Sequence, residues 1–183
     1  MTEYCKFVKH LYAATAKVEA AYFQLPVAGA EDPIYRERVY TYELYHRLRE
    51  GWPLDGYSLG GEVDKTNHPK IRGNNLDYKK PDYIVHVPRE MEKNLLVAEV
   101  KPANVRRENL KKDLECLTAF CVYAQYQNAF LLIYGSNEDT PTQIREMAKT
   151  SSSESSEKIN LDLIDFFWHP ASGKSAQLIQ WET

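Results

Sequence analysis

The sequence predicts one α/β domain in which helices flank a central mixed β-sheet. A chain of 183 residues with 43% hydrophobic residues is long enough to bury one core and too short for two full domains. Apolar residues recur at helical spacing in three segments, namely 3–24, 34–50 and 105–125. Four shorter segments rich in Val, Ile, Leu and Tyr are typical of strands, namely 57–65, 82–87, 95–101 and 129–134.

The helices are predicted from apolar spacing and from residues that end a helix. Apolar residues of the first helix recur at steps of three and four before Pro26, and they are Phe7, Leu11, Ala14, Val18 and Tyr22. The second helix is expected to end before Gly51 and Pro53, because glycine favours a helix end and proline cannot continue one. A fourth, shorter helix is expected to begin at Thr140, since Pro141 suits the first helical position.

The four predicted strands differ in their expected surroundings. The first three are separated by turn-forming residues, so we expect them to form a meander. Segment 129–134 is apolar throughout and ends at Gly135, which is typical of a central strand covered on both faces. After it, the polar tract 151–156 predicts a mobile loop, and segments 161–166 and 176–181 predict closing strands.

These elements divide residues 1–183 into a core with two flanking parts. The core is expected to cover residues 34–135, with an N-terminal helical extension at 1–33 and a C-terminal helix and strands at 136–183. No segment has the roughly 18 consecutive apolar residues that a membrane span needs, and the N-terminal residues do not resemble a signal peptide. We therefore expect a cytoplasmic protein without a membrane partner.

Charge and cysteine content limit the classes of function. The formal net charge of -3 gives no overall attraction to nucleic acid, but segment 65–112 has twelve basic and six acidic residues. That segment could bind phosphate, and a solvated basic face explains it equally well. The three cysteines lack the spacing of a zinc site or a disulfide framework, and they are Cys5, Cys116 and Cys121.

Three polar residues stand at the ends of two predicted strands. Asp82 begins segment 82–87, and Glu99 and Lys101 end segment 95–101 on one face, because side chains alternate along a strand. An antiparallel hairpin would bring Asp82 beside both of them. We expect Asp82, Glu99 and the Val100 carbonyl to hold Mg²⁺ or Mn²⁺, which prefer oxygen ligands. Lys101 would orient or deprotonate an attacking water, as phosphodiester hydrolysis requires.

The order of elements and these motifs resemble a known family. A helix, three strands, a helix and a strand (αβββαβ), with Pro81-Asp82 entering the second strand and Glu99-Val100-Lys101 ending the third, resemble the restriction-endonuclease-like core of the PD-(D/E)XK nucleases. The resemblance covers about 34–135. It implies a metal-dependent nuclease that cleaves DNA, with RNA as the alternative substrate, and a role in microbial defence. It also implies an acidic residue on the preceding helix, and Glu43 matches that position.

The helix after the third strand carries a basic cluster. In the family this helix often supplies residues that contact phosphate, and the basic residues here are Arg106, Arg107, Lys111 and Lys112. A helix N-terminus also favours phosphate, so the resemblance implies a nucleic-acid-binding role for the four side chains. The same run is also typical of a solvated helix face.

Each of these interpretations has an alternative. Asp82, Glu99 and Lys101 could form a structural ion pair, and Glu43 could pair with Arg47 one turn later. Other polar side chains near the predicted site are Glu62, Asp64, His46 and His86. A nuclease-fold protein that binds nucleic acid or a protein partner without cleavage stays open. So does a plain interaction domain, in which the tyrosine-rich first two helices form the face of a homodimer.

Overall fold

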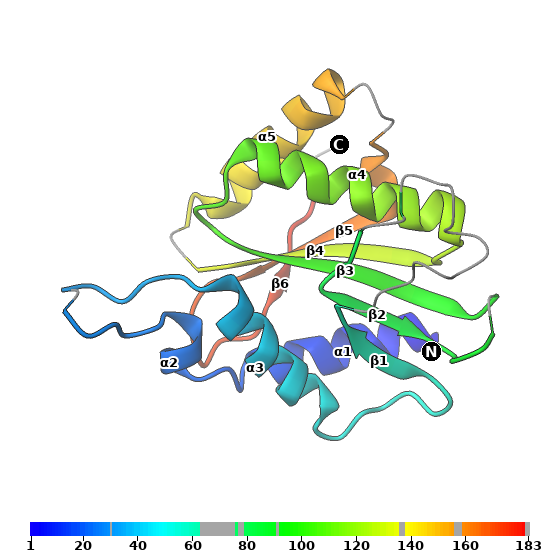
Figure 1. The fold of residues 1–183 in the computed structure, drawn as a ribbon, viewed down its shortest axis with the longest axis horizontal. Helices are drawn as coiled ribbons and strands as arrows, with labels where there is room; N and C mark the ends of the chain where they lie inside the picture. The colour runs from blue at the N-terminus through cyan, green and yellow to red at the C-terminus, as the bar shows by residue number, and fades with distance from the viewer. Residues whose placement is uncertain are drawn as a thin grey trace.

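A computed structural model describes residues 1–29, 31–62, 76, 79–90, 92–135, 138–155 and 159–181. The fold is α/β, with one open mixed sheet of six strands in the order β1-β2-β3-β4-β5-β6. Helices cover both faces of this sheet, with α4 and α5 on one side and α1, α2 and α3 on the other (Figure 1). The predicted fold class is confirmed at this level, although the four strands expected in the core belong to a wider sheet.

The sheet combines an antiparallel and a parallel part. Strands β1 (Ser58–Gly61), β2 (Tyr83–His86) and β3 (Asn94–Pro102) pair antiparallel, as the predicted meander requires. Strand β4 (Asn128–Tyr134) runs parallel to β3 and to β5 (Ile164–His169), and β6 (Gln177–Leu178) closes the sheet antiparallel to β5. The expectation that segment 129–134 is central and covered on both faces is confirmed, because six of the seven β4 residues are buried.

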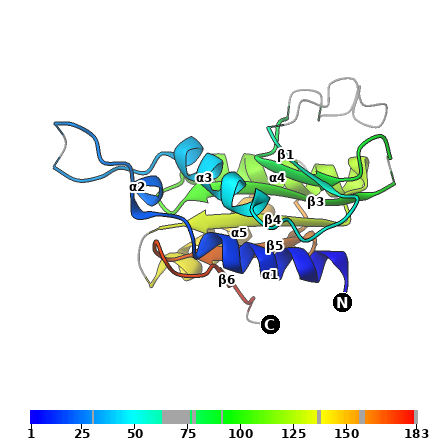
Figure 2. The ribbon, with the colours of Figure 1, turned by 90° about the horizontal axis from the view of Figure 1, so that it is seen from below.

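The helices pack on the sheet through two apolar clusters. Helices α1 (Glu3–Thr15) and α3 (Glu37–Arg49) cover one face, as seen from below in Figure 2. Helices α4 (Arg107–Ala124) and α5 (Thr140–Glu154) cover the other face. From β3, Leu96, Ala98 and Val100 belong to the first cluster and Val97 to the second, so both sides of the strand are removed from water.

The first predicted helix is wrong in its length. Helix α1 ends at Thr15, and a separate short helix, α2 (Ala20–Phe23), follows an extended residue at Glu19. The Thr15 hydroxyl donates to the Leu11 carbonyl and accepts from the Ala176 backbone N–H at 2.9 Å. This tertiary hydrogen bond holds the chain at the helix end, and apolar spacing alone gave no sign of it.

The polar tract at 151–156 was expected to be a mobile loop, and its described part is not. Helix α5 continues to Glu154, so Ser151 to Glu154 form its last turn. Ser151 is buried, and the Ser155 hydroxyl donates to Glu115 on α4 at 2.6 Å. Packing against α4 therefore overrides the weak helix propensity of serine. Ser156 lies outside the described residues.

The C-terminal segment forms the closing strands at shifted positions. A 3-10 turn at Leu161–Leu163 precedes β5, so the strand begins three residues later than predicted. Gly135 ends β4 with a φ of 95°, a conformation that favours glycine, and a Cβ there would lie 2.5 Å from the Tyr35 ring. In the described part of the chain, every helix is too short or too polar to cross a lipid bilayer.

Candidate functional site

The strand register brings together the three residues that the sequence singled out. Tyr83 on β2 pairs with Ala98 on β3, so Asp82 lies beside the next residue, Glu99. The Val100 backbone N–H donates to Asp82 Oδ2 at 2.7 Å, which fixes the carboxylate against β3. Glu99 and Lys101 lie on one face of β3, as predicted, while Leu96, Ala98 and Val100 pack in the cluster on the other face.

Lys101 lies among four carboxylates. Its Nζ atom is 2.9 Å from Glu37 Oε1, 3.6 Å from Glu99 Oε2, and 3.8 Å from oxygens of both Asp82 and Asp113. Lys101 and these four side chains are called the carboxylate cluster below. The Lys101 side chain is only 11% exposed, so water screens these charges weakly. One ammonium therefore faces four buried or half-buried carboxylates.

Burial and like charge change the pKa values in the carboxylate cluster. Burial, together with the charges of Asp82 and Asp113, raises the pKa of Glu99 well above its ordinary range. Burial raises the pKa of Asp113 to about 7, and it raises that of Asp82 against the opposing effect of Lys101. The carboxyl groups of Glu99 and Asp82 are close enough to share a hydrogen bond when one of them is protonated. The cluster therefore binds protons more strongly than separate carboxylates do.

The charge of Lys101 responds in the opposite sense. Burial alone would lower the pKa of its ammonium group, but the surrounding carboxylates of Asp82, Asp113 and Glu99 raise it. Lys101 is therefore charged at neutral pH. In this structure its ammonium balances negative charge, and it cannot accept a proton from water until that balance changes.

Two members of the carboxylate cluster were missed in the sequence, although each carried a signal. Glu37 is spaced at three, four and seven positions from the buried residues Tyr40, Thr41 and Leu44 of α3. Asp113 lies between Leu110, Leu114 and Leu117 on the buried side of α4. A charged residue at a core-facing helical position is costly to bury unless it has a partner or a role.

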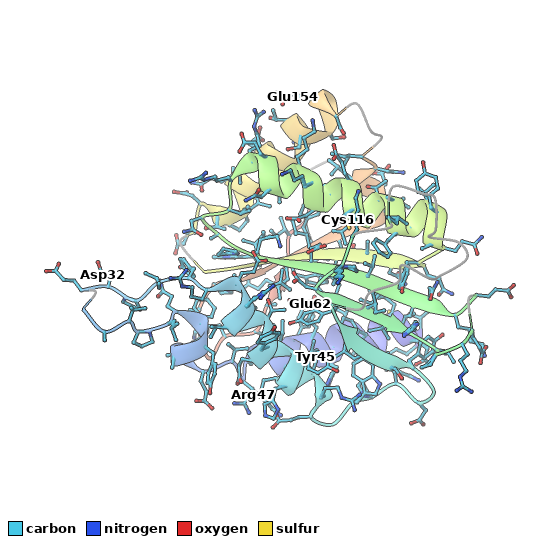
Figure 3. The ribbon with its side chains drawn as sticks, viewed as in Figure 1. Asp32, Tyr45, Arg47, Glu62, Cys116 and Glu154 are labelled. Atoms are coloured by element: carbon cyan, nitrogen blue, oxygen red, sulfur yellow. The ribbon has the colours of Figure 1, made fainter. Side chains whose placement is uncertain are left out.

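Glu43, the helix carboxylate chosen from the family resemblance, points elsewhere. It accepts a hydrogen bond from Arg47 Nε at 2.6 Å and is 8% exposed. Figure 3 labels Arg47 on the side of α3 away from α4. The structure thus favours the salt-bridge interpretation of Glu43. Glu37, six residues earlier on the same helix, takes its place in the candidate site because its Oε1 atom is 2.9 Å from Lys101 Nζ.

The four basic residues predicted to bind nucleic acid, which are the N-cap Arg106 and three residues of α4, separate into two pairs. Arg106 and Lys112 line a pocket of about 450 Å³ together with Lys101, Glu37, Asn104, Asn109 and Asp113. Arg107 instead forms an ion pair with Glu154 at 2.8 Å, and Lys111 donates to the Glu154 carbonyl. Only Arg106 and Lys112 are therefore placed beside the carboxylate cluster.

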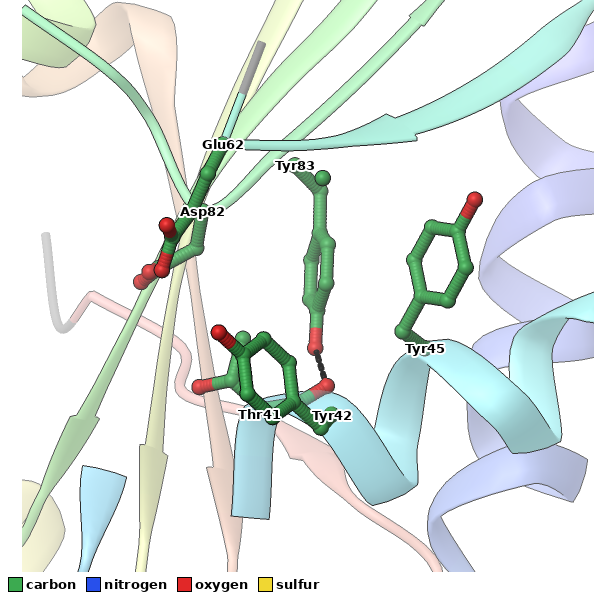
Figure 4. Close-up of a pocket in the computed structure, with 7 residues that line it drawn as sticks. Thr41, Tyr42, Tyr45, Glu62, Asp82 and Tyr83 are labelled. Carbon is green, nitrogen blue, oxygen red and sulfur yellow. Dashed lines mark hydrogen bonds between the residues drawn. The ribbon is translucent and has the colours of Figure 1, made fainter. Parts of the chain in front are cut away.

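A second pocket borders the carboxylate cluster at Asp82. It has a volume of about 290 Å³, and its lining includes three tyrosine rings, Tyr42, Tyr45 and Tyr83. In the view of Figure 4, the Asp82 and Glu62 carboxylates lie at the left, the Tyr42 ring lies below them, and the Tyr83 and Tyr45 rings lie to the right. The Tyr83 hydroxyl donates to the Thr41 carbonyl, and the Tyr45 hydroxyl donates to the Leu59 carbonyl. Two of the three rings are therefore held in place.

The remaining candidates lie outside the carboxylate cluster. His46 is exposed and contacts Glu50 at 3.5 Å, and His86 occupies the opposite end of β2 from Asp82. Glu62 pairs with Arg38 at 3.8 Å, while Asp64 is not among the described residues. The Val100 N–H is engaged by Asp82, and a metal role for the Val100 carbonyl stays a prediction.

Comparisons of the chain with protein-family models, with curated proteins and with solved structures give no match.

The chemistry of the carboxylate cluster suits a hard divalent cation. All four acidic side chains offer oxygen ligands, their negative charge exceeds that of the single ammonium, and Asp113 Oδ2 is buried without a hydrogen-bond partner. Within the described ranges, no three His, Cys, Asp or Glu side chains are already arranged around one metal position. Lys101 contacts each carboxylate instead, so metal binding would require the ammonium to move.

Proposed function

We propose that the protein is a Mg²⁺- or Mn²⁺-dependent nuclease of the PD-(D/E)XK type that hydrolyses phosphodiester bonds, with DNA as its substrate. The observation that carries this proposal is the buried carboxylate cluster, in which Asp82 and Glu99 from paired strands meet Lys101. Placing four carboxylates together without an equal number of cations is unfavourable for stability. A role in catalysis would account for such an arrangement.

Each residue has a role that follows from its position. Asp82 and Glu99 would hold the metal, with Asp113 as a third carboxylate whose Oδ2 atom has no hydrogen-bond partner. A bound divalent metal would lower the pKa of its water and offset phosphate charge. Lys101, released from carboxylates neutralised in this way, would orient the water. Arg106 and Lys112 would bind a neighbouring phosphate in their pocket.

A second candidate function is a nuclease-fold protein that binds nucleic acid without cleaving it. It is favoured by the position of Lys101, whose ammonium contacts all four carboxylates and so occupies the place of a cation. For such a protein, Mg²⁺ and Mn²⁺ would bind weakly or not at all, and Lys101→Ala would leave nucleic-acid binding unchanged.

The test is incubation of the purified protein with single- and double-stranded DNA and RNA in the presence of Mg²⁺ or Mn²⁺. We expect cleavage that Asp82→Ala, Glu99→Ala and Lys101→Ala each reduce by about a hundredfold or more. Glu90→Ala is a matched control, because this exposed carboxylate pairs with Lys93 in the turn between β2 and β3. Isothermal titration with Mg²⁺ measures the metal site directly.

Two results would overturn the proposal. The first is cleavage that survives both Asp82→Ala and Glu99→Ala, which would place the activity elsewhere. The second is the absence of cleavage and of metal binding for a folded wild-type protein, which would leave the non-cleaving alternative. Thermal unfolding monitored by circular dichroism shows whether each variant is folded.

A further inference from the structure

The tyrosine-lined pocket beside Asp82 has the features of a ring-binding site. Tyr45 and Tyr83 are fixed by hydrogen bonds to backbone carbonyls, so two of its walls are already ordered. Tyr42 is 59% exposed, although a tyrosine ring gains stability when it is covered. The volume of about 290 Å³ is at the small end for ligand pockets, which suits a single flat ring system better than a peptide.

The carboxylates of this pocket favour a ligand that donates hydrogen bonds. Its two charged side chains are Glu62 and Asp82, and ionised carboxylates only accept hydrogen bonds. Figure 4 shows both carboxylates on the same side of the pocket. A ring that lies against Tyr42 would therefore gain hydrogen bonds if it presents N–H groups to these carboxylates. Cytosine and adenine have an exocyclic amino group with this property, and thymine lacks one.

The position of the pocket connects it to the carboxylate cluster. Asp82 belongs to both, so a base that enters the pocket would bring the phosphodiester backbone of its strand close to the carboxylate cluster. Arg106 and Lys112 line the pocket that includes Lys101, where a neighbouring phosphate of the same strand would bind. A base within a duplex is stacked and paired, so it cannot enter without leaving the helix.

We propose that the pocket of Tyr42, Tyr45 and Glu62 holds one unpaired nucleobase that carries an amino group, and that the substrate is therefore single-stranded at the bound nucleotide. The proposal rests on the nuclease function for its substrate class. Stacking on an aromatic ring supplies affinity for any base, and the carboxylates add the preference for an amino group.

The experiment is fluorescence anisotropy with dye-labelled oligo-dC, oligo-dA and oligo-dT of equal length and with a duplex, in Ca²⁺, which takes the same kind of oxygen ligands as Mg²⁺. We expect oligo-dC and oligo-dA to bind more tightly than oligo-dT and the duplex. Tyr42→Ala should weaken oligo-dC binding about tenfold, while Tyr42→Phe keeps it. Glu62→Ala should remove most of the preference for oligo-dC over oligo-dT.

Matched control variants show whether a loss of oligonucleotide binding is specific to this pocket or follows from the loss of any exposed ring or carboxylate. Tyr123→Ala removes another exposed ring, on α4, and Glu90→Ala removes an exposed carboxylate far along the β2–β3 hairpin. Both should bind every oligonucleotide as the wild type does. The proposal is overturned if Tyr42→Ala behaves like Tyr123→Ala, if oligo-dT binds as well as oligo-dC, or if the duplex binds most tightly.

Failure of the base-binding proposal can be distinguished from failure of the nuclease proposal. Binding that depends on Tyr42 and on the base, without cleavage in Mg²⁺ or Mn²⁺, would support the pocket and reject the nuclease. Cleavage that depends on Asp82 but not on Tyr42, with equal affinity for all bases, would reject the pocket alone.

Discussion

Helix α3 contributes carboxylates to two clusters that have similar charges and different burial. Arg47 contacts Glu43, Glu19 and Glu50, of which the last two are 64% and 39% exposed. Lys101 contacts Glu37 and three carboxylates whose exposed fractions are between 9% and 16%. In each cluster one cation contacts several carboxylates, and in the Arg47 cluster Lys17 also contacts Glu50 at 3.6 Å. Composition alone therefore does not explain how differently the two clusters are buried.

The difference between the two clusters shows that an excess of negative charge shifts pKa values strongly only where the carboxylates are buried. Around Arg47, water screens the outer carboxylates and reduces both attraction and repulsion. Around Lys101, burial raises the pKa values of Asp82, Glu99 and Asp113. The buried cluster should therefore respond strongly to pH and to loss of its cation, and the exposed one weakly.

Removal of the Lys101 charge should change the free energy of unfolding most. Lys101→Met leaves the carboxylates of its cluster without their ammonium, so the free energy of unfolding should fall by about 3 kcal/mol at pH 8 without divalent cations. The loss should be smaller at pH 5, where the carboxyls with raised pKa values are protonated. Urea denaturation at both pH values measures the difference. An equal loss at both would mean that lost side-chain packing, and not charge, is the cause.

Neutralising Asp113 should have a smaller effect of the opposite sign. Its pKa is raised from 3.8 to about 7, so the folded state binds this proton more tightly than the unfolded chain does. Ionisation of Asp113 therefore reduces stability as pH rises from about 4 to about 7. Asp113→Asn cannot ionise, and it should be more stable than the wild type by about 1 kcal/mol at pH 8, with the gain vanishing near pH 4.

The wild type must be compared with Asp113→Asn, because ionisation of His169 changes the stability of both proteins with pH in the opposite direction. Burial lowers the pKa of His169 to about 4, so its contribution to stability increases between about pH 4 and 6.5. This contribution is common to the wild type and Asp113→Asn, so it cancels in their difference. Urea denaturation of the wild type and of Asp113→Asn between pH 4 and pH 8 measures the difference in their free energies of unfolding. A difference that does not change with pH would contradict the raised pKa of Asp113.

A change in the exposed cluster should have the smallest effect. Glu19→Gln removes a carboxylate that contacts Arg47 at 2.8 Å but is 64% exposed. The free energy of unfolding should change by less than about 0.5 kcal/mol, equally at pH 6 and pH 8. A large or strongly pH-dependent loss would show that exposure does not separate the two clusters.

Sequence patterns predicted most of the sheet correctly, because the burial of each face of a strand is visible in the order of apolar and polar residues along that strand. The unbroken apolar run of β4 indicated a buried central strand, and the alternation of β3 indicated which face carries Glu99 and Lys101. The end of α1 and the last turn of α5 were not predicted. They depend on contacts of Thr15 with Ala176 and of Ser155 with Glu115, which are distant in the sequence.

The candidate site was predicted in part for the same reason. Asp82, Glu99 and Lys101 lie on neighbouring strands, so strand alternation and a hairpin were enough to bring them together. Glu37 is 64 positions from Lys101, and Asp113 lies on the following helix. Their approach depends on how α3 and α4 are rotated against the sheet, and the choice of Glu43 instead of Glu37 came from that missing rotation.

The sequence by itself determined the α/β class, the β2–β3 hairpin and the meeting of two carboxylates with one lysine. Each of these follows from the period of a single element and the turn that joins two neighbours. Only the tertiary structure decided that two more carboxylates join the cluster, and that only Arg106 and Lys112 among the four basic residues predicted to bind nucleic acid lie beside it. Helix rotation and burial, which decide which side chains share a low-dielectric space, depend on the packing of the whole chain.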